Sequence, residues 1–232
     1  MKVGIFTDPH YSSREVSCKR RYNSLSLRKI GEAMEDFVAR GCDFAVCLGD
    51  VIDTEAEHEK ETENLRAVGR LLDRFELPCY CVMGNHDGFR FPVEEFYRVL
   101  GEARRPRDFS AEGKTFLFLD ACYHRDGAHY APGRSDWTDV AYPYGKELEN
   151  RLRTAEGEVF LFLHQNLDPN VERRHILANA EELRASVAAC GRVKAVFQGH
   201  YHPGRESRVD GILYRTFPAM CEAEKCWFVL DV

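Results

Sequence analysis

The stretch VMGNHDGF (Val82–Phe89) joins an apolar run to a glycine, an amide, an imidazole and a carboxylate. The apolar residues that lead into it, CYCVM, have the composition of a short buried strand. Four other apolar runs end in a similar way: VGIF then TDPH, FAVCL then GD, VFLFL then HQN, and VKAVF then QGHYH. In an open α/β sheet the carboxyl ends of parallel strands face one crevice. The sequence therefore predicts that polar side chains spread from Asp8 to His202 meet in space.

Apolar periodicity predicts alternating strands and helices along the chain. The first part predicts strands at 3–6, 44–48 and 79–83 and helices at 27–38, 65–75 and 93–100, the last opened by Pro92. This alternation is typical of parallel strands. The second part predicts strands at 109, 115–119, 159–163, 193–197, 205–209, 212–217 and 226–230, and a helix at 181–190 capped by Asn179. Hairpin turns at Glu112-Gly113 and Asp210-Gly211 make the sheets mixed.

Composition limits the classes of protein to consider. The 232 residues contain no linker or low-complexity tract, so we expect one domain over residues 1–232. A net charge of −6 disfavours a stable nucleic-acid partner or an anionic membrane surface. The apolar runs are far shorter than the roughly 18 residues of a membrane span. The start, MKVGIFTDPH, reads as a first strand, and nine cysteines without CxxC spacing read as free thiols, so we expect a cytoplasmic protein.

Side chains at the strand ends supply candidate metal ligands. The seven candidates are Asp8, His10, Asp50, Asn85, His164, His200 and His202. One bridging carboxylate plus three further donors for each ion would suit two ions about 3.5–4 Å apart. Glycines at 49, 84 and 199 precede ligands and allow tight turns. Imidazole, carboxylate and amide donors without thiolate suit Mn, Fe, Zn or Co.

The blocks DPH (8–10), GD (49–50), GNHD (84–87), a lone histidine at 164 and GHYH (199–202) resemble the pattern of the calcineurin-like metallophosphoesterases, in the same order. That resemblance implies an α/β (α+β) fold, a four-layer αββα sandwich of two mixed sheets flanked by helices. It also implies that Asp50 bridges two metal ions. The other ligands divide between them: Asp8, His10 and His202 for the first, and Asn85, His164 and His200 for the second.

The same resemblance implies catalytic roles for two residues of the GNHD block. His86 is expected beside the scissile phosphoryl group, where it protonates the leaving oxygen or stabilises its charge. Asp87 is expected to orient His86 or its loop. The nucleophile is then a hydroxide activated by the metal ions, because bound divalent ions lower the pKa of water. No serine or cysteine nucleophile is needed.

The segments RRYNSLSLRKIGEAMEDF and DFAVCLGDVID resemble a narrower branch, the manganese-dependent ADP-ribose and CDP-alcohol diphosphatases and the bacterial cyclic-nucleotide phosphodiesterase-like proteins. Asp87 stands where the diphosphatases typically have glutamate. The resemblance implies a small-molecule phosphodiester or pyrophosphate substrate derived from a nucleotide. A phosphomonoesterase, a protein phosphatase and a nuclease of the same fold remain alternatives. A non-catalytic interaction module is disfavoured because the ligand set and His86 are complete.

Several residues outside the ligand blocks are candidates for substrate contacts. Tyr11, Arg20 and Arg21 follow the first block and are expected at the rim of the site, where they contact phosphate or a base. Residues 121–144 form a long aromatic loop that reads as a lid. Its aromatic residues either stack on a nucleobase, with Tyr123 the first candidate, or pack on the protein itself: Tyr123, Trp137, Tyr142 and Tyr144. Asp53 reads as a turn or capping residue, and four other histidines read as structural or surface residues: His58, His124, His129 and His175.

Overall fold

The computed structural model of the chain describes residues 1–134 and 136–232. One sheet has four strands in the order β10-β1-β2-β3. Its strands are β1 (Lys2–Phe6), β2 (Phe44–Cys47), β3 (Cys79–Cys81) and β10 (Trp227–Asp231). The first three run parallel and β10 pairs antiparallel with β1. This sheet is therefore mixed, with β3 and β10 at its edges.

The other sheet has six strands in the order β4-β5-β6-β7-β9-β8. Its strands are β4 (Phe109–Ala111), β5 (Lys114–Leu119), β6 (Glu158–Leu163), β7 (Val193–Gln198), β8 (Arg205–Val209) and β9 (Ile212–Thr216). The four inner strands run parallel, and β4 and β8 are antiparallel edges. Both predicted hairpin turns are confirmed. Asp210 and Gly211 have φ values of 52° and 79°, as a two-residue turn of this kind requires.

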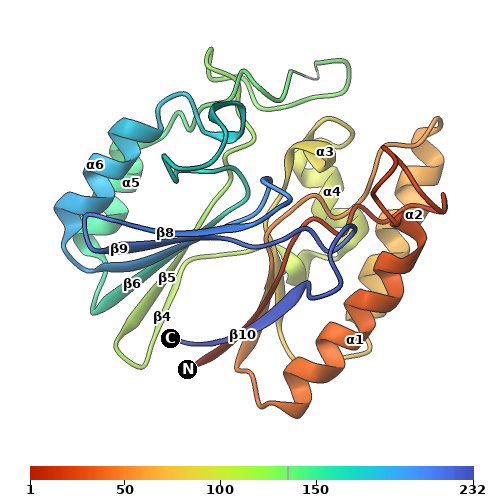
Figure 1. Ribbon diagram of the computed structural model, residues 1–232, viewed down its shortest axis with the longest axis horizontal. Helices are drawn as coiled ribbons and strands as arrows, with labels where there is room; N and C mark the ends of the chain where they lie inside the picture. The colour runs from red at the N-terminus through yellow and green to blue at the C-terminus, as the bar shows by residue number, and fades with distance from the viewer. Residues whose placement is uncertain (135) are drawn as a thin grey trace.

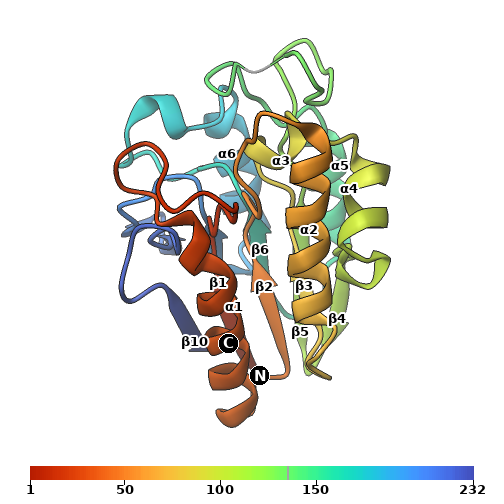
Figure 2. The same ribbon diagram turned by 90° about the vertical axis from the view of Figure 1, so that its right-hand side faces the viewer.

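Helices cover the outer face of each sheet (Figures 1 and 2). The four-stranded sheet is flanked by α1 (Ser26–Ala39), α2 (His58–Leu72) and α4 (Val93–Leu100). The six-stranded sheet is covered by α5 (Gly145–Thr154) and α6 (Ala180–Cys190). Shorter segments are α3 (Asn85–Gly88) and three 3-10 turns, η1 (Asn23–Leu25), η2 (Glu102–Arg104) and η3 (Arg173–His175). The predicted four-layer arrangement of two mixed sheets between helices is confirmed.

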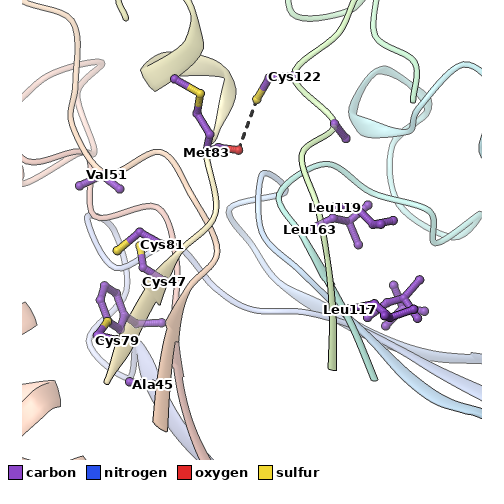
Figure 3. Packing of buried hydrophobic residues seen from close by; sticks show 14 of the residues in the cluster. Ala45, Cys47, Val51, Cys79, Cys81, Met83, Leu117, Leu119, Cys122 and Leu163 are labelled. Carbon is purple, nitrogen blue, oxygen red and sulfur yellow. Dashed lines mark hydrogen bonds between the residues drawn. The ribbon is translucent and has the colours of Figure 1, made fainter. Parts of the chain in front are cut away.

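The two faces of each sheet bury different side chains, because successive strand residues point in opposite directions. The inter-sheet layer is rich in phenylalanine: Val3, Ile5, Phe44, Phe116, Phe118, Phe160, Phe162 and Phe197. The opposite faces pack beneath the helices, and Figure 3 shows Cys47 and Cys81 on one sheet and Leu117 and Leu163 on the other. All nine cysteines of the described chain are free thiols, and seven are buried.

One helix was not predicted from the sequence, and one predicted helix cap is wrong. Helix α5 was not predicted because Leu148 and Leu152 are its only buried residues and charged residues dominate the rest, so its apolar periodicity is weak. Asn179 lies at the N-cap position of α6, but within the described chain its side chain makes no capping hydrogen bond. It instead accepts from the backbone N–H of Tyr142 and donates to the Tyr142 carbonyl, which anchors the returning end of loop 121–144. Both polar atoms of the Asn179 side chain therefore bond to the loop, and none is left to cap the helix.

The carboxyl ends of the parallel strands and the loop that follows β5 gather at one end of the sandwich, and the chain termini lie at the other (Figure 1). The terminal amino group of Met1 donates to the carbonyl of Val232 at 3.0 Å, so the two ends meet there. Within the described residues, every helix is too short or too polar to cross a lipid bilayer. The polar residues that follow the parallel strands therefore lie together at the end of the sandwich opposite the chain termini.

Candidate metal centre

The strands of both sheets deliver the predicted ligands to one place. Asp8 and His10 follow β1, Asp50 follows β2, and Asn85 opens α3 after β3. From the second sheet, His164 follows β6, and His200 and His202 follow β7. The ring Nε2 atoms of His10 and His202 lie 3.3 Å apart although 192 positions separate them in sequence. The Nε2 of His164 lies 3.1 Å from Asn85 Oδ1. All seven candidates converge.

Asp50 lies at the middle of this cluster. Its Oδ2 is 3.4 Å from His10 Nε2 and 3.3 Å from His164 Nε2. Its Oδ1 accepts a hydrogen bond from the backbone N–H of His86 at 2.8 Å. Two groups of closely spaced ligand atoms share Asp50, one with His10 and His86 and the other with His164 and His200. One carboxylate facing two ligand groups is the geometry that a bridging ligand requires.

Two buried atoms of the cluster have no hydrogen-bond partner in the described part of the chain, Asp8 Oδ1 and His200 Nε2. Leaving such an atom unsatisfied in the interior costs about 1–3 kcal/mol. The other carboxylate oxygen of Asp8 accepts from Thr7 Oγ1 and from the backbone N–H of His200. A cation bound between these groups would satisfy both open atoms. The donor set of imidazoles, carboxylates and one amide oxygen therefore fits a metal centre.

The backbone at the centre adopts conformations that side-chain-bearing residues rarely use. Positive φ angles occur at Asp8, His10, Asp50 and His200 (50°, 44°, 52° and 67°). Such strain collects where the surrounding structure enforces a functional geometry. Gly84 and Gly199 are needed for space, because a Cβ at Gly84 would overlap the backbone and carboxylate of Asp50, and a Cβ at Gly199 would overlap the Thr7 hydroxyl. The strand ends thus pack backbone directly against the ligand atoms.

Charges in the centre balance one another. Burial alone would raise the pKa of Asp8, but the imidazoles of His10 and His202, whose Nε2 atoms lie 3.8 Å and 3.4 Å from Oδ1, hold that pKa well below its usual value. Burial would likewise raise the pKa of Asp50, and the charge of His164 and then of His86 lowers it instead. In the opposite sense, burial lowers the pKa of His164 and His202, yet the neighbouring carboxylates raise both to about 9. The carboxylates therefore stabilise positive charge at the positions where metal ions would bind.

The far side of two imidazole rings is held by fixed partners. His164 Nδ1 donates to the carbonyl of Leu48 at 2.7 Å, and His202 Nδ1 lies 2.6 Å from Glu222 Oε1. These contacts turn both Nε2 atoms toward the centre. A carboxylate behind a ligating histidine fixes its tautomer and raises its basicity. The sequence analysis did not identify Glu222, because it follows no strand-end motif.

Replacing Glu222 tests this orientation. The Glu222→Ala variant is expected to weaken metal binding by about 10–100-fold, the usual cost of losing such a partner. Metal retained after dialysis against graded chelator concentrations measures the change. Glu224→Ala is the matched control, because Glu224 is exposed two residues further along. Equal retention by the two variants would contradict the orienting role.

His86 and Asp87 have separate surroundings. His86 Nδ1 lies 3.3 Å from Asp53 Oδ1, and the His86 side chain remains 24% exposed toward the cleft. The Asp87 carboxylate accepts from the backbone N–H groups of Val51, Ile52 and Gly84, so it holds the loop rather than His86. Burial and then the Asp50 charge raise the pKa of Asp87 to about 7.

Asp53 was expected to be a turn or capping residue, and this expectation is wrong. Its buried carboxylate accepts from Ser17 Oγ at 2.6 Å, Asn23 Nδ2 at 3.0 Å and Arg21 at 3.2 Å. Burial would raise the pKa of Asp53, but the imidazoles of His10 and His86, with Nδ1 atoms 3.7 Å and 3.3 Å from its carboxylate, lower it strongly. Asp53 therefore stays ionised beside His86. Its role was not predicted because its hydrogen-bond donors are 30 or more residues away in the sequence.

A cleft of about 380 Å³ opens above the centre. Arg20 and Arg21 line it, as expected for substrate contacts. Tyr11 and Tyr123 are not among the described residues that line it. Tyr11 bridges to Ile52 and packs on the core, whereas Tyr123 contacts His129 and Tyr144.

The opposite wall of the cleft contains Trp137, one of the four aromatic residues named above as candidates for stacking, together with residues that were expected to have another role or were not predicted. Loop 121–144 contributes Trp137, whose ring centroid lies 5.3 Å from that of His200; position 135 of this loop lies outside the described residues. His175 was expected to be structural, yet its ring lies 5.0 Å from that of His200. Arg174 and Tyr201 complete this wall. No pattern in the sequence marks Arg174, His175 or Tyr201 as wall residues, because their segments meet Trp137 only in the folded chain.

Comparison with known proteins agrees with this geometry. A family model described as calcineurin-like phosphoesterase matches residues 1–204. A Fibrobacter succinogenes protein named as a probable cyclic nucleotide phosphodiesterase is 22% identical over 215 residues, which cover 87% of this chain and 73% of that protein. The human serine/threonine-protein phosphatase CPPED1 is 28% identical over 171 residues, 68% of this chain and 53% of the phosphatase. The chain thus spans about half the length of that relative.

A solved structure supports the same assignment at the level of the fold. The crystal structure of a dimetal phosphatase from Danio rerio superposes with a TM-score of 0.84 at 17% identity, over 99% of this chain and 91% of that one. Calcineurin-like phosphoesterases use dinuclear metal sites, and the described chain contains candidate ligand groups for such a site. The match over most of the chain shows that it belongs to the calcineurin-like phosphoesterase family, whose members are metal-dependent hydrolases of phosphoesters.

Proposed function

We propose that this chain binds two divalent or transition metal ions and hydrolyses a small-molecule phosphodiester or pyrophosphate derived from a nucleotide. Asp50 carries the proposal, because its carboxylate lies between two ligand groups on the floor of a cleft. Asp8, His10 and His202 would hold the first ion, and Asn85, His164 and His200 the second. Asp50 would bridge the two. Mn, Fe, Zn and Co all suit these donors.

When bound, the two ions would polarise the phosphoryl oxygens and lower the pKa of a water molecule. The chain's own residues then position the substrate and handle the leaving group. His86 reaches the cleft beside Asp50, and its ring centroid lies 4.6 Å from that of His10. The Asp53 carboxylate lies 3.3 Å from His86 Nδ1 and would stabilise the protonated ring, whose Nε2–H would then donate a proton or a hydrogen bond to the leaving oxygen.

The cleft walls favour a phosphorylated planar group. Arg20 and Arg21 border one side, and Arg174 lies on the other with its guanidinium 6.0 Å from the Trp137 ring centroid. Arginine binds phosphate oxygens in a planar, bidentate manner. An indole face stacks on a nucleobase. A cleft of about 380 Å³ is also in the range of small-ligand sites. Together these features support a nucleotide-derived substrate.

Removing the indole tests the planar subsite. The Trp137→Ala variant is expected to lose about 1–3 kcal/mol of stacking, roughly a 5- to 150-fold increase in KM for a nucleotide substrate, with little change in kcat. Steady-state kinetics on a nucleotide diester and on a dialkyl phosphodiester measure it. Tyr144→Ala is the control, because Tyr144 belongs to the same loop but is not among the described residues of the cleft wall. Equal losses on both substrates would contradict stacking.

The function itself is tested by a panel of metals and substrates. The protein loaded with Mn, Fe, Zn or Co is compared on nucleotide diesters, ADP-ribose-like pyrophosphates, phosphomonoesters and phosphopeptides. We expect the highest kcat/KM on a nucleotide diester or pyrophosphate. The relative named as a serine/threonine-protein phosphatase makes phosphopeptide hydrolysis the main competitor, and a higher kcat/KM there would replace the proposal. A nuclease is disfavoured by the net charge of −6.

A further inference from the structure

A buried thiol lies beside the candidate metal centre on a segment that belongs to none of the ligand motifs. Cys221 is fully buried. One ligand atom from each of His10, His202 and Cys221 lies within 4.8 Å of the other two. In the sequence Cys221 is one of nine scattered cysteines outside the ligand motifs, which alone predict a centre without thiolate. The folded chain brings this sulfur to the ligands assigned above to the first ion.

Residues 219–223 are held against both turns that carry those ligands. The backbone N–H of Cys221 donates to the carbonyl of Asp8 at 3.2 Å. The backbone N–H of Ala219 donates to the carbonyl of His202 at 3.0 Å. The Nζ of Lys29 donates to the carbonyls of Met220 and Ala223. The position of the thiol is therefore fixed relative to the ligands by hydrogen bonds on three sides.

The sulfur and a neighbouring oxygen both lack partners within the described chain. The Cys122 thiol shows the usual alternative, since it donates to the carbonyl of Met83 at 3.3 Å (Figure 3). No such acceptor contacts the Cys221 thiol among the described residues. Asp8 Oδ1 is buried without a hydrogen-bond partner, 3.4 Å from His202 Nε2 and 3.8 Å from His10 Nε2. The Cys221 sulfur and Asp8 Oδ1 therefore each lie close to the same two imidazoles, those of His10 and His202.

We propose that Cys221 is a ligand of the first metal ion, together with Asp8, His10 and His202. This rests on the dinuclear centre proposed above and adds a thiolate to it. Binding breaks the S–H bond, forms a sulfur–metal bond and releases one proton to solvent, without oxidation or reduction. Thiolate favours Zn, Fe or Co over Mn and Mg. The second position has only imidazole, carboxylate and amide donors, so the two positions differ in metal preference.

Cobalt spectroscopy of the full chain tests this assignment. Metal-free protein titrated with up to two equivalents of Co²⁺ should develop visible ligand-field bands and a near-ultraviolet thiolate-to-cobalt charge-transfer band. The Cys221→Ser variant should keep the ligand-field bands and lose the charge-transfer band. Cys226→Ser is the matched control, because Cys226 is equally buried but is in none of the candidate ligand groups of the described chain, and it should keep both.

The outcomes separate this proposal from the metal centre itself. Ligand-field bands without a charge-transfer band in the wild-type protein, or a charge-transfer band that persists in Cys221→Ser, would overturn the role of Cys221 and leave the centre intact. Failure of the wild-type protein to bind cobalt would overturn the centre. If Cys221→Ser does not fold, X-ray absorption of the zinc-loaded wild-type protein decides. A sulfur shell at about 2.3 Å supports the proposal, and a shell of nitrogen and oxygen alone contradicts it.

Discussion

The Asp50→Asn variant is expected to keep its fold, lose metal from both positions and lose at least roughly 10³-fold in kcat. Asp50 Oδ2 faces His10 on one side and His164 on the other, so one substitution removes a negative ligand from both ligand groups. Bound metal ions supply several kcal/mol of transition-state stabilisation, and each 1.36 kcal/mol changes the rate tenfold. Elemental analysis and turnover measured on the same preparation test both parts of this expectation.

A matched control separates metal loss from damage to the backbone. Asp50 and Asp210 both have a φ of 52°, a conformation that asparagine tolerates well. Asp210→Asn lies at an exposed hairpin turn and should leave metal content and turnover unchanged. Two fully retained metal ions in Asp50→Asn would contradict the bridging assignment. Thermal unfolding followed by circular dichroism would show whether either variant loses its fold.

The convergence of the ligands was predictable from sequence for a specific physical reason. Strand periodicity marks where each buried run ends, and parallel topology brings those ends to one edge. Asp8, Asn85 and His200 each stand within a few residues of such an end, so local pattern and global geometry agree. Glycine before the ligand adds information where backbone packs on backbone, as Gly84 does against Asp50. The end of an apolar run and a glycine before a ligand can both be recognised from a few neighbouring residues.

The surroundings of the centre were not predictable in the same way. Glu222 contacts His202 from 20 residues away, Asp53 contacts His86 from 33 residues away, and Cys221 reaches His10 across most of the chain. Each of these residues lies in an irregular segment whose course is set by long-range hydrogen bonds. A single sequence contains no periodicity from which such a course follows. The supporting residues of a site are therefore harder to predict than its ligands.

The cleft wall shows the same limit for substrate contacts. Proximity to the first ligand block suggested Arg20 and Arg21, which line the cleft, but it also suggested Tyr11, which packs against the core. Within loop 121–144 four aromatic residues were candidates for stacking, and Tyr123 was the first of them. Trp137 lines the cleft, whereas Tyr123 is not among the described residues that line it and Tyr142 is buried. Which aromatic residue faces the substrate depends on how the loop is anchored, here partly by Asn179.

The His86→Ala variant is expected to retain both metal ions and to lose about 10²–10⁴-fold in kcat, the usual contribution of a positioned acid. His86 neighbours His10 and Asp50, but its Nδ1 lies 3.3 Å from the Asp53 carboxylate and its ring reaches the cleft, so we assign it to the leaving group rather than to a metal ion. The loss should be greater for an alkyl leaving group than for p-nitrophenolate, because the alkoxide needs a proton more. Turnover of two phosphodiesters that differ only in the leaving group measures this difference.

Two further variants decide how His86 acts. Asp53→Asn should lower kcat on the alkyl ester in the same direction as His86→Ala, and by less, because the imidazole remains while the buried carboxylate that orients it becomes neutral. In the double variant, Asp53→Asn should add little to His86→Ala, since residues that act as a unit are not additive. His58→Ala on α2 is the control for loss of an imidazole, because His58 contacts Glu61 and Phe91 far from the cleft wall. Unchanged turnover of the alkyl ester in His86→Ala would rule out the acid role, and fully additive losses would mean that Asp53 acts through His10 instead.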